Sequence, residues 1–395
     1  MKILIVDTEK VLPGPSYSGS SQVRWGLIKG LQNQNVCVGY YSASPGINEF
    51  DKYNGSEIAS EIGVNQVWLR QPSPKFSKEE GVRKLQGALD EFKPDVVLAL
   101  GMQSLEFVRD TRYRGKVGIV WVDLEFLPSL YRIYNTFIYG GESKGIIKAL
   151  IKTWNNYRKV INIYPKADFI INHAAHHADW HRRRHGKKTL YVPNPVPPLF
   201  NENPHKEVTK PARFILLGGL GSVSTTSGLG WFAQHVYPLI EPKLINGEIE
   251  IHLIGRHTPR GPFVNKMQHL IYRGYVEDLG IEMLKSTALL VPTPIKIGFR
   301  TRILEAFRYG VAVIAHEANA VGMPELKHEH NALLSKKGKD FADAILRLTN
   351  KPIDAITIGN NGFSDFSRQL NSDFVGSKIL EFIDKEVLYG NKHFN

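Results

Sequence analysis

Short apolar runs alternate with amphipathic stretches along the whole chain, which is the pattern of a parallel α/β sheet. Between several of the runs the spacing predicts helices, for example over Lys78–Phe92. The runs of the first half predict strands at 2–7, 36–41, 66–69, 96–100, 117–122 and 167–172, the last being the final strand of that half. Those of the second half predict strands at 213–217, 249–254, 288–292 and 311–315. An α/β fold follows from this alternation.

The two halves open in the same way, with a strand, a loop of small residues and a helix. The strand at 2–7 is followed by Gly14–Ser21 and a helix from about Gln22 to Gln32. The strand at 213–217 is followed by Gly218–Ser222. This is the opening of a Rossmann-like domain. The first loop is neither a Gly-x-Gly-x-x-Gly fingerprint nor a P-loop, and on its own it fits a merely flexible loop equally well.

A basic loop lies between the strand at 288–292 and a helix that begins near Ile303 and ends at Gly310. It places Arg300 and Arg302 at the carboxyl end of a strand, where open α/β sheets bind ligands. Two guanidiniums suit a diphosphate, and Glu305 in the first helical turn can accept hydrogen bonds from a ribose diol. The alternative is an ordinary helix start with solvated arginines.

This loop resembles the donor-site signature of nucleotide-sugar glycosyltransferases with the GT-B fold, of the family-4-like or group 1 type. The matching residues are Gly298, Arg300, Arg302, Leu304, Glu305 and Ala306. Ile297 departs from the pattern, because many members have a second Glu eight positions before the one at 305. Further stretches resemble the family at the proline-rich linker 191–198, at 228–238, at 272–276 and at 322–326.

The resemblance implies two Rossmann-like domains that face an interdomain cleft. The N-terminal acceptor-side domain would span 1–190, the nucleotide-sugar-binding domain 191–365, and C-terminal helices at 366–395 would return to the first domain. It also implies a hexosyltransferase that moves a sugar from a nucleotide-diphosphate sugar to a glycan or lipid-linked acceptor, with retention and without a metal or cofactor. An inverting transferase, a nucleotide-sugar epimerase and a non-catalytic basic binding module remain alternatives.

Site residues follow from the same resemblance. Arg300 and Arg302 would stabilise the leaving group and so count as catalytic residues. Asp123, which follows the strand at 117–122, would act as general base or hold an acceptor hydroxyl; a helix-capping role and Glu125 as the active carboxylate are the alternatives. The acceptor side would comprise Gly19, Ser20 and Asp123. The donor-binding set would comprise Gly219, Gly221, Arg256, Tyr275, Val276, Gly298, Arg300, Arg302 and Glu305.

The composition of the chain indicates the cellular compartment in which the protein works. The chain of 395 residues has a single cysteine, Cys37, which excludes an internal disulfide and a thiolate cluster. Apolar runs stay shorter than a transmembrane helix, and Asp7 interrupts the first of them, so we expect no signal peptide. These features favour the cytoplasm.

Charge is unevenly distributed. The net charge is +12, and residues 131–188 contain twelve basic but only three acidic side chains. Within them, 131–163 reads as an amphipathic helix with Lys144, Lys148 and Lys152 beside an apolar stripe. This predicts peripheral association with the anionic inner face of a membrane rather than nucleic-acid binding. A core-packed helix with a solvated basic face is the alternative.

Five histidines follow the strand at 167–172, at positions 173, 176, 177, 181 and 185. His173, His177 and His181 would share one helix face, but no Cys or acidic ligand accompanies them at zinc-site spacing. The cations Arg182–Arg184 beside them disfavour a metal ion. We therefore predict no metal site and a basic, polar helix that could bind phosphate.

Overall fold

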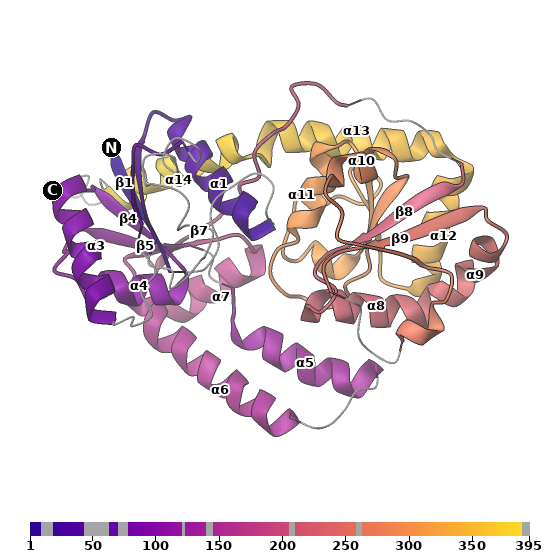
Figure 1. The fold of residues 1–395 in the computed structure, drawn as a ribbon, viewed down its shortest axis with the longest axis horizontal. Coiled ribbons are helices and arrows are strands. Elements are labelled where there is room, and N and C mark those ends of the chain that lie inside the picture. Colours follow the sequence, from indigo (N-terminus) through magenta and orange to yellow (C-terminus); the bar gives the residue numbers. More distant parts are fainter. Residues whose placement is uncertain are drawn as a thin grey trace. The chain divides into compact units, whose positions relative to one another are not determined.

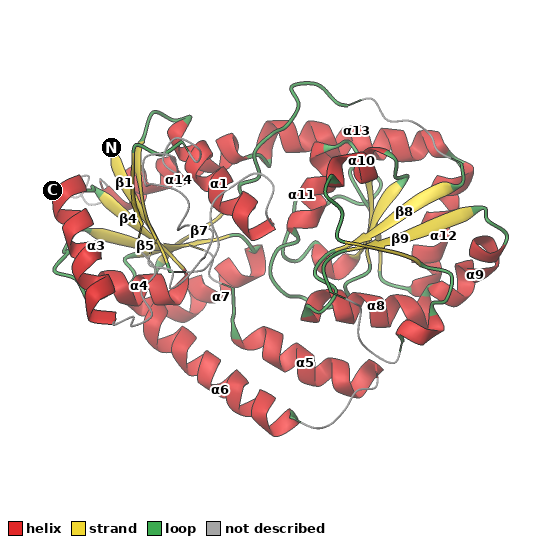
Figure 2. Ribbon diagram, viewed as in Figure 1, coloured by secondary structure: helices red, strands yellow, loops and turns green. Residues whose placement is uncertain are grey.

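The structure is a computed structural model that describes residues 1–8, 19–42, 63–69, 78–120, 123–139, 145–204, 210–257 and 263–388. The chain divides into two compact units. Unit 1 comprises Met1–Leu124, Tyr157–Pro197 and Leu370–Asn395, and unit 2 comprises Glu125–Asn156 and Pro198–Gln369. Each unit contains one parallel sheet with helices packed against it (Figures 1 and 2). The predicted α/β class with two Rossmann-like domains is confirmed.

Unit 1 is built on a seven-stranded sheet with the order β3-β2-β1-β4-β5-β6-β7, in which every pairing is parallel. The strands are β1 (Lys2–Asp7), β2 (Cys37–Ser42), β3 (Gln66–Leu69), β4 (Val96–Leu100), β5 (Lys116–Val120), β6 (Phe169–Asn172) and β7 (Lys188–Tyr191). The predicted strands of the first half are confirmed to within a few residues, although 121–122 lie outside the described residues.

The prediction that 167–172 forms the final strand of the first half is wrong. β7 pairs with β6 through Phe169–Lys188 to Asn172–Tyr191 and extends the sheet by one strand. Its sequence, Lys-Thr-Leu-Tyr, is only half-buried because β7 lies at the sheet edge. An edge strand does not need the continuous apolar run by which buried strands are recognised.

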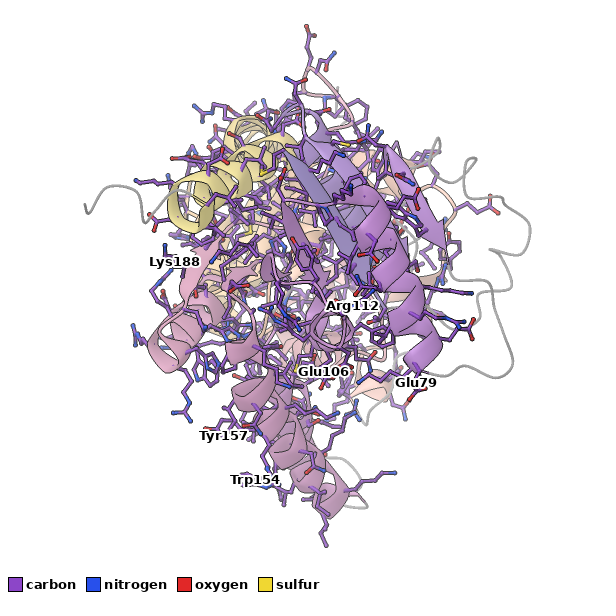
Figure 3. The ribbon with its side chains drawn as sticks, turned by 90° about the vertical axis from the view of Figure 1, so that its left-hand side faces the viewer. Glu79, Glu106, Arg112, Trp154, Tyr157 and Lys188 are labelled. Carbon is purple, nitrogen blue, oxygen red and sulfur yellow. The ribbon has the colours of Figure 1, made fainter. Side chains whose placement is uncertain are left out.

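Helices α1 (Gly19–Gln32), α3 (Lys78–Phe92), α4 (Gly101–Arg109), α7 (Ala175–His185) and α14 (Ser372–Phe382) complete unit 1. Figure 3 shows Glu79 on the exposed side of α3. α14 packs closely on α1, since a Cβ built on Gly376 would lie 2.0 Å from the carbonyl oxygen of Gly30. Val375, Ile379 and Ile383 join the core beside the sheet. The last helices of the chain therefore complete the core that β1 begins.

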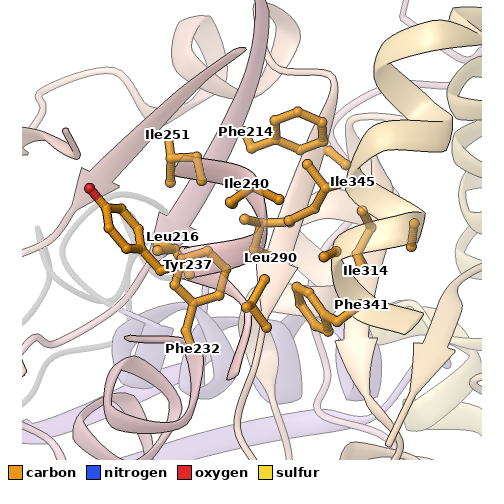
Figure 4. Packing of buried hydrophobic residues seen from close by; sticks show 14 of the residues in the cluster. Phe214, Leu216, Phe232, Tyr237, Ile240, Ile251, Leu290, Ile314, Phe341 and Ile345 are labelled. Carbon is orange, nitrogen blue, oxygen red and sulfur yellow. The ribbon is translucent and has the colours of Figure 1, made fainter. Parts of the chain in front are cut away.

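Unit 2 is built on a six-stranded parallel sheet with the order β10-β9-β8-β11-β12-β13. The strands are β8 (Ala212–Leu217), β9 (Ile249–Ile254), β10 (Ile271–Gly274), β11 (Ala288–Val291), β12 (Ala312–His316) and β13 (Leu333–Ser335). The predicted strands of the second half are confirmed. Phe214, Leu290 and Ile314 on the sheet meet Phe232 and Phe341 on helices in the core (Figure 4).

Helices cover this sheet and carry its connections. They are α8 (Val223–His235), α9 (Tyr237–Ile245), α10 (Leu279–Leu284), α11 (Thr301–Arg308), α12 (Gly338–Asn350) and α13 (Pro352–Gln369), with short 3-10 turns at Val264–Lys266 and Glu317–Asn319. Unit 1 has a 3-10 turn at Tyr164–Lys166 and a π-helical turn at Ile383–Leu388. The predicted start of α11 is confirmed to within two residues. Gly310, with φ +63°, follows its last turn as predicted.

Two helices occupy the region predicted as helical at 131–163. They are α5 (Phe126–Tyr139) and α6 (Ile146–Ile163), and residues 140–144, including Lys144, lie outside the described residues. α5 packs on α8: the hydroxyl of Ser227 donates to Asn135 Oδ1 at 2.7 Å, and a Cβ on Gly230 would lie 2.6 Å from the Tyr139 ring. For this reason α5 belongs to unit 2, although its sequence lies within the predicted range 1–190.

Candidate functional site

The strand order of unit 2 creates a switch point between β8 and β11. From β8, the chain builds the sheet first towards β9 and β10 and then, from β11 onwards, in the opposite direction. At such a point the loops after two adjacent strands diverge, and open α/β sheets bind ligands in the space between them. In unit 2 these loops are Gly218–Ser222 after β8 and 292–300 after β11. They contain four of the nine predicted donor residues, namely Gly219, Gly221, Gly298 and Arg300.

Arg302 connects the two loops. It lies in the first turn of α11, after β11, yet its Nη1 donates to the Leu217 carbonyl at the end of β8. Its Nη2 donates to Thr225 Oγ1 at 3.3 Å. Gly218, with φ +146°, permits this approach, because a Cβ there would lie 2.9 Å from Nη1. Burial lowers the pKa of Arg302 to about 10, so the guanidinium remains cationic at neutral pH.

Two helix N-termini flank this guanidinium. α8 begins after Ser222, whose hydroxyl caps the helix by accepting from the Thr225 amide at 3.3 Å. α11 begins after Arg300, a buried residue in the N-cap position. Helix N-termini present backbone N–H groups and partial positive charge, which favour anions. Together with Arg300 and Arg302, they make this edge of the sheet electropositive.

The Gly218–Ser222 loop leaves space above its backbone. A Cβ built on Gly219 or Gly221 would meet no described atom within 4 Å. Gly298, in the facing loop, has φ +56°, a conformation that favours glycine. The predicted glycines are thus placed where a ligand can approach the main chain.

Arg256 and Tyr275 lie in the next two loops and contact each other. The guanidinium carbon of Arg256 is 4.9 Å from the centroid of the Tyr275 ring, and both side chains are exposed. The Leu220 amide donates to the Arg256 carbonyl at 3.3 Å, which ties this loop to the one after β8. Val276 follows and is half-buried. An exposed ring backed by a cation is a suitable stacking surface for a planar ligand group.

Glu305 has a partner that the sequence did not predict. Its side chain is buried, and Oε1 accepts from Arg308 Nη2 at 2.6 Å. Burial raises the pKa of Glu305, and Arg308 opposes this shift. A ribose contact would therefore use a carboxylate that an arginine already orients, and it stays a prediction.

Asn319 is a site residue that sequence reasoning missed. Its Nδ2 donates to the carbonyls of Val291, Thr293 and His316 at 3.3, 3.2 and 2.7 Å, so it fastens the ends of β11 and β12 together. A small pocket next to it is lined by Thr293, Thr225 and Arg302 among others. A lone asparagine after a strand gives no pattern from which this role could have been read.

In unit 1, the start of α1 is held to the end of β1. Asp7, fully buried, accepts from Arg24 Nε at 2.5 Å and from the Tyr40 hydroxyl at 2.9 Å. Arg24 Nη1 donates in turn to the Ser20 carbonyl at 3.2 Å and to the Ser20 hydroxyl. Gly19 and Ser20 therefore lie at the carboxyl edge of this sheet, and their acceptor-side role stays a prediction; residues 14–18 lie outside the described residues.

Asp123 is exposed and forms a pair with a buried histidine. Its Oδ1 is 3.0 Å from Nδ1 of His177, which α7 contributes with no side-chain exposure. The main-chain carbonyl of Asp123 accepts from the Tyr164 hydroxyl at 3.3 Å. A fully buried imidazole restrains the carboxylate, which remains open to solvent. Asp123, Gly19 and Ser20 belong to unit 1, and the donor residues belong to unit 2.

The other histidines of α7, and His173 just before it, pack against neighbouring residues. His173 is buried with Nδ1 2.9 Å from the carbonyl oxygens of Val192 and Pro193, and burial lowers its pKa to about 4. His181 lies 4.8 Å from the Tyr164 ring and stacks on His185 at 5.5 Å. Within the described part of the chain, no group of three or more His, Cys, Asp or Glu side chains is placed to hold a metal ion.

Comparisons with known proteins identify the class. Residues 212–351 match the family described as "Glycosyl transferases group 1". Sucrose-phosphate synthase from Thermosynechococcus elongatus is 13% identical, with a TM-score of 0.67 over 98% of this chain and 99% of that one. HepE from Anabaena in complex with UDP is 15% identical, with a TM-score of 0.63 over 97% and 100%. TarM is 10% identical, with a TM-score of 0.69 over 96% and 98%. No curated protein sequence matches this one.

The fold is that of GT-B glycosyltransferases. Residues 212–351, which contain the switch point with Arg300, Arg302 and Glu305, match the group 1 glycosyltransferase family, and this match together with the GT-B fold supports a glycosyltransferase. The resemblance recognised in the sequence is thereby confirmed. The sugar, the nucleobase, the acceptor and the stereochemistry are matters for the proposal below.

Proposed function

We propose that the protein transfers a sugar from a nucleoside-diphosphate sugar, with a uridine nucleotide as the first candidate, to a glycan or lipid-linked acceptor. The observation that carries the proposal is Arg302, whose guanidinium spans the switch point between β8 and β11. HepE has been crystallised with UDP and with UDP-glucose, which supports the choice of nucleotide.

The donor diphosphate would bind between the N-termini of α8 and α11. Arg300 and Arg302 would donate to its oxygens, and these donors would strengthen as the sugar–phosphate bond breaks and negative charge grows on the leaving group. The base would lie against Tyr275, and the ribose hydroxyls would donate to Glu305. All these groups belong to unit 2, which therefore contains a full set of donor contacts.

Asp123 would hold the acceptor hydroxyl, with His177 orienting its carboxylate. Transfer with retention of the anomeric configuration and without a metal ion follows from the family resemblance. Proton NMR of the newly formed glycoside gives the anomeric configuration directly, and an assay in excess EDTA tests metal independence. An inverted product would instead assign Asp123 the role of general base.

The decisive experiment is calorimetry with UDP, GDP and ADP on the intact chain. Arg300→Ala should weaken binding of the preferred nucleotide tenfold or more, since a hydrogen bond to a charged group contributes about 1.5–3 kcal/mol. Arg368→Ala is the matched control, because Arg368 is an exposed arginine of unit 2 paired with Asp365 on α13. Equal affinity of wild type and Arg300→Ala would remove the diphosphate assignment.

A further inference from the structure

The first three turns of α6 expose their apolar face. Ile147, Leu150, Ile151 and Trp154 recur at the spacing of one helix face, and their side chains are 75, 51, 56 and 60% exposed. No residue of 146–156 is buried; the first buried residue of the helix is Val160. The predicted alternative of a core-packed helix is therefore wrong for this part of α6.

α5 repeats the arrangement. Its residues Leu130, Tyr134, Phe137 and Ile138 lie on one face, with exposures of 44, 44, 71 and 47%. Its other side is occupied, because Asn135 and Tyr139 face α8. We refer to these eight residues of α5 and α6 as the apolar rows. All of them belong to unit 2.

The charged residues on α5 and α6 themselves have one sign. α5 and α6 contain the cations Arg132, Lys148, Lys152, Arg158 and Lys159 and no acidic residue. All five are exposed. A protein partner that covered the rows would need an equally one-sided acidic surface, whereas an anionic lipid surface supplies negative headgroups above an apolar interior.

The stability of short helices also indicates that the apolar rows are covered in the working protein. An amphipathic stretch of about three turns is marginally stable in water unless its apolar face is covered. Phe137 and Ile147 are among the most exposed large apolar side chains in the described part of the chain. Figure 3 shows Trp154 and Tyr157 along α6. No described helix is long and apolar enough to cross a membrane.

We propose that the apolar rows of α5 and α6 insert into the surface of an anionic phospholipid bilayer. The aliphatic and aromatic side chains would enter the boundary between headgroups and acyl chains, and the five cations would bind lipid phosphates. Because α5 packs on α8, unit 2 with its donor site would be anchored directly. This proposal does not rest on the donor assignment, and vesicle binding and nucleotide binding report on the two separately.

The test is co-sedimentation of the intact protein with vesicles of phosphatidylcholine alone or mixed with phosphatidylglycerol. Wild type should pellet with the mixed vesicles at low salt, less at high salt, and little with phosphatidylcholine alone. Lys148→Glu combined with Lys152→Glu should weaken binding at least about 25-fold, given about a fivefold contribution per cation. Lys336→Glu combined with Lys339→Glu, two exposed lysines of unit 2, is the matched control and should bind as wild type.

Apolar insertion is tested by Ile147→Ser combined with Ile151→Ser. This variant should lose vesicle binding, whereas Ile353→Ser, which removes a 65% exposed isoleucine from α13, should not. Brominated lipid should quench the tryptophan fluorescence of wild type more than that of Trp154→Phe, because Trp154 enters the bilayer. Trp154→Phe should still bind vesicles. All variants should keep the nucleotide affinity of wild type, which reports intact folding of unit 2.

Three results would overturn the proposal. They are absence of wild-type binding to anionic vesicles at low salt, equal binding to neutral vesicles, and full binding by the double serine variant. A second copy of the chain is the remaining candidate partner for the apolar rows, and sedimentation velocity without lipid tests for it. If wild type forms a dimer and the double serine variant does not, a second copy covers the rows, and membrane insertion is refuted as well.

Discussion

Replacing Glu305 by Gln separates its proposed role in binding ribose from its place in the core. The carboxylate is buried and 2.6 Å from Arg308 Nη2. Burial raises its pKa, so the ionised form is disfavoured in the folded state, and Arg308 only partly offsets this. Gln removes the penalty for a buried charge but keeps an oxygen that accepts from Arg308. Because Arg308 is also buried and would lose its counter-charge, we nevertheless expect the free energy of unfolding at pH 7 to fall by about 3–5 kcal/mol.

Donor affinity of the folded protein reports the ribose contact separately from stability. A ribose hydroxyl gains about 1 kcal/mol more from a charged acceptor than from a neutral amide, so two hydroxyls predict a five- to thirtyfold weaker UDP affinity in Glu305→Gln. A 2′,3′-dideoxy nucleotide should bind wild type and variant alike. Calorimetry measures both, with Glu248→Gln as the control, since Glu248 is an exposed glutamate of unit 2 paired with Lys243 just before β9. Equal UDP affinities, or equal losses for both nucleotides, would refute the ribose contact.

Two further predictions concern stability. The pKa of His173 falls from 6.5 to about 4 on folding because the ring is buried, so unfolding becomes easier by up to roughly 3 kcal/mol as the pH drops from above 6.5 to 4. Urea unfolding at several pH values should show this dependence in wild type and a weaker one in His173→Gln; parallel curves would exclude the histidine as its source. Gly230→Ala would place a methyl group 2.6 Å from the Tyr139 ring and should destabilise unit 2 by about 1–3 kcal/mol in thermal unfolding. An unchanged unfolding temperature would mean that α5 can shift away from the new methyl group at little cost.

The strands were predictable because fully buried parallel strands need continuous apolar runs. β1, β4 and β11 have such runs and were located closely. β7 was missed because a half-buried edge strand carries no such run. The donor loop was recognisable because its glycines, arginines and glutamate are adjacent in sequence.

Contacts between distant segments were beyond the reach of the sequence. Nothing in the pattern around Asp123 points to His177, which approaches from a helix that follows another strand. The Arg302–Leu217 bond joins two loops 85 positions apart in the chain. Such pairs depend on strand order and on side-chain reach, which periodicity does not encode. The apolar stripe of α6 was visible in the sequence, but only the structure shows that its first three turns are exposed.

The packing of α5 on α8 and of α14 on α1 means that neither unit is a continuous stretch of chain. During synthesis, α5 leaves the ribosome before α8, the helix on which it packs, has been made. The core of unit 1 still lacks Val375 and Ile379 when all seven of its strands have emerged. A fragment cut at the linker would carry α5 away from Ser227 and Gly230 and leave α1 without α14. Folding of each unit should therefore be completed only after its last segment has been synthesised, and expression of either half alone should yield insoluble or protease-sensitive material.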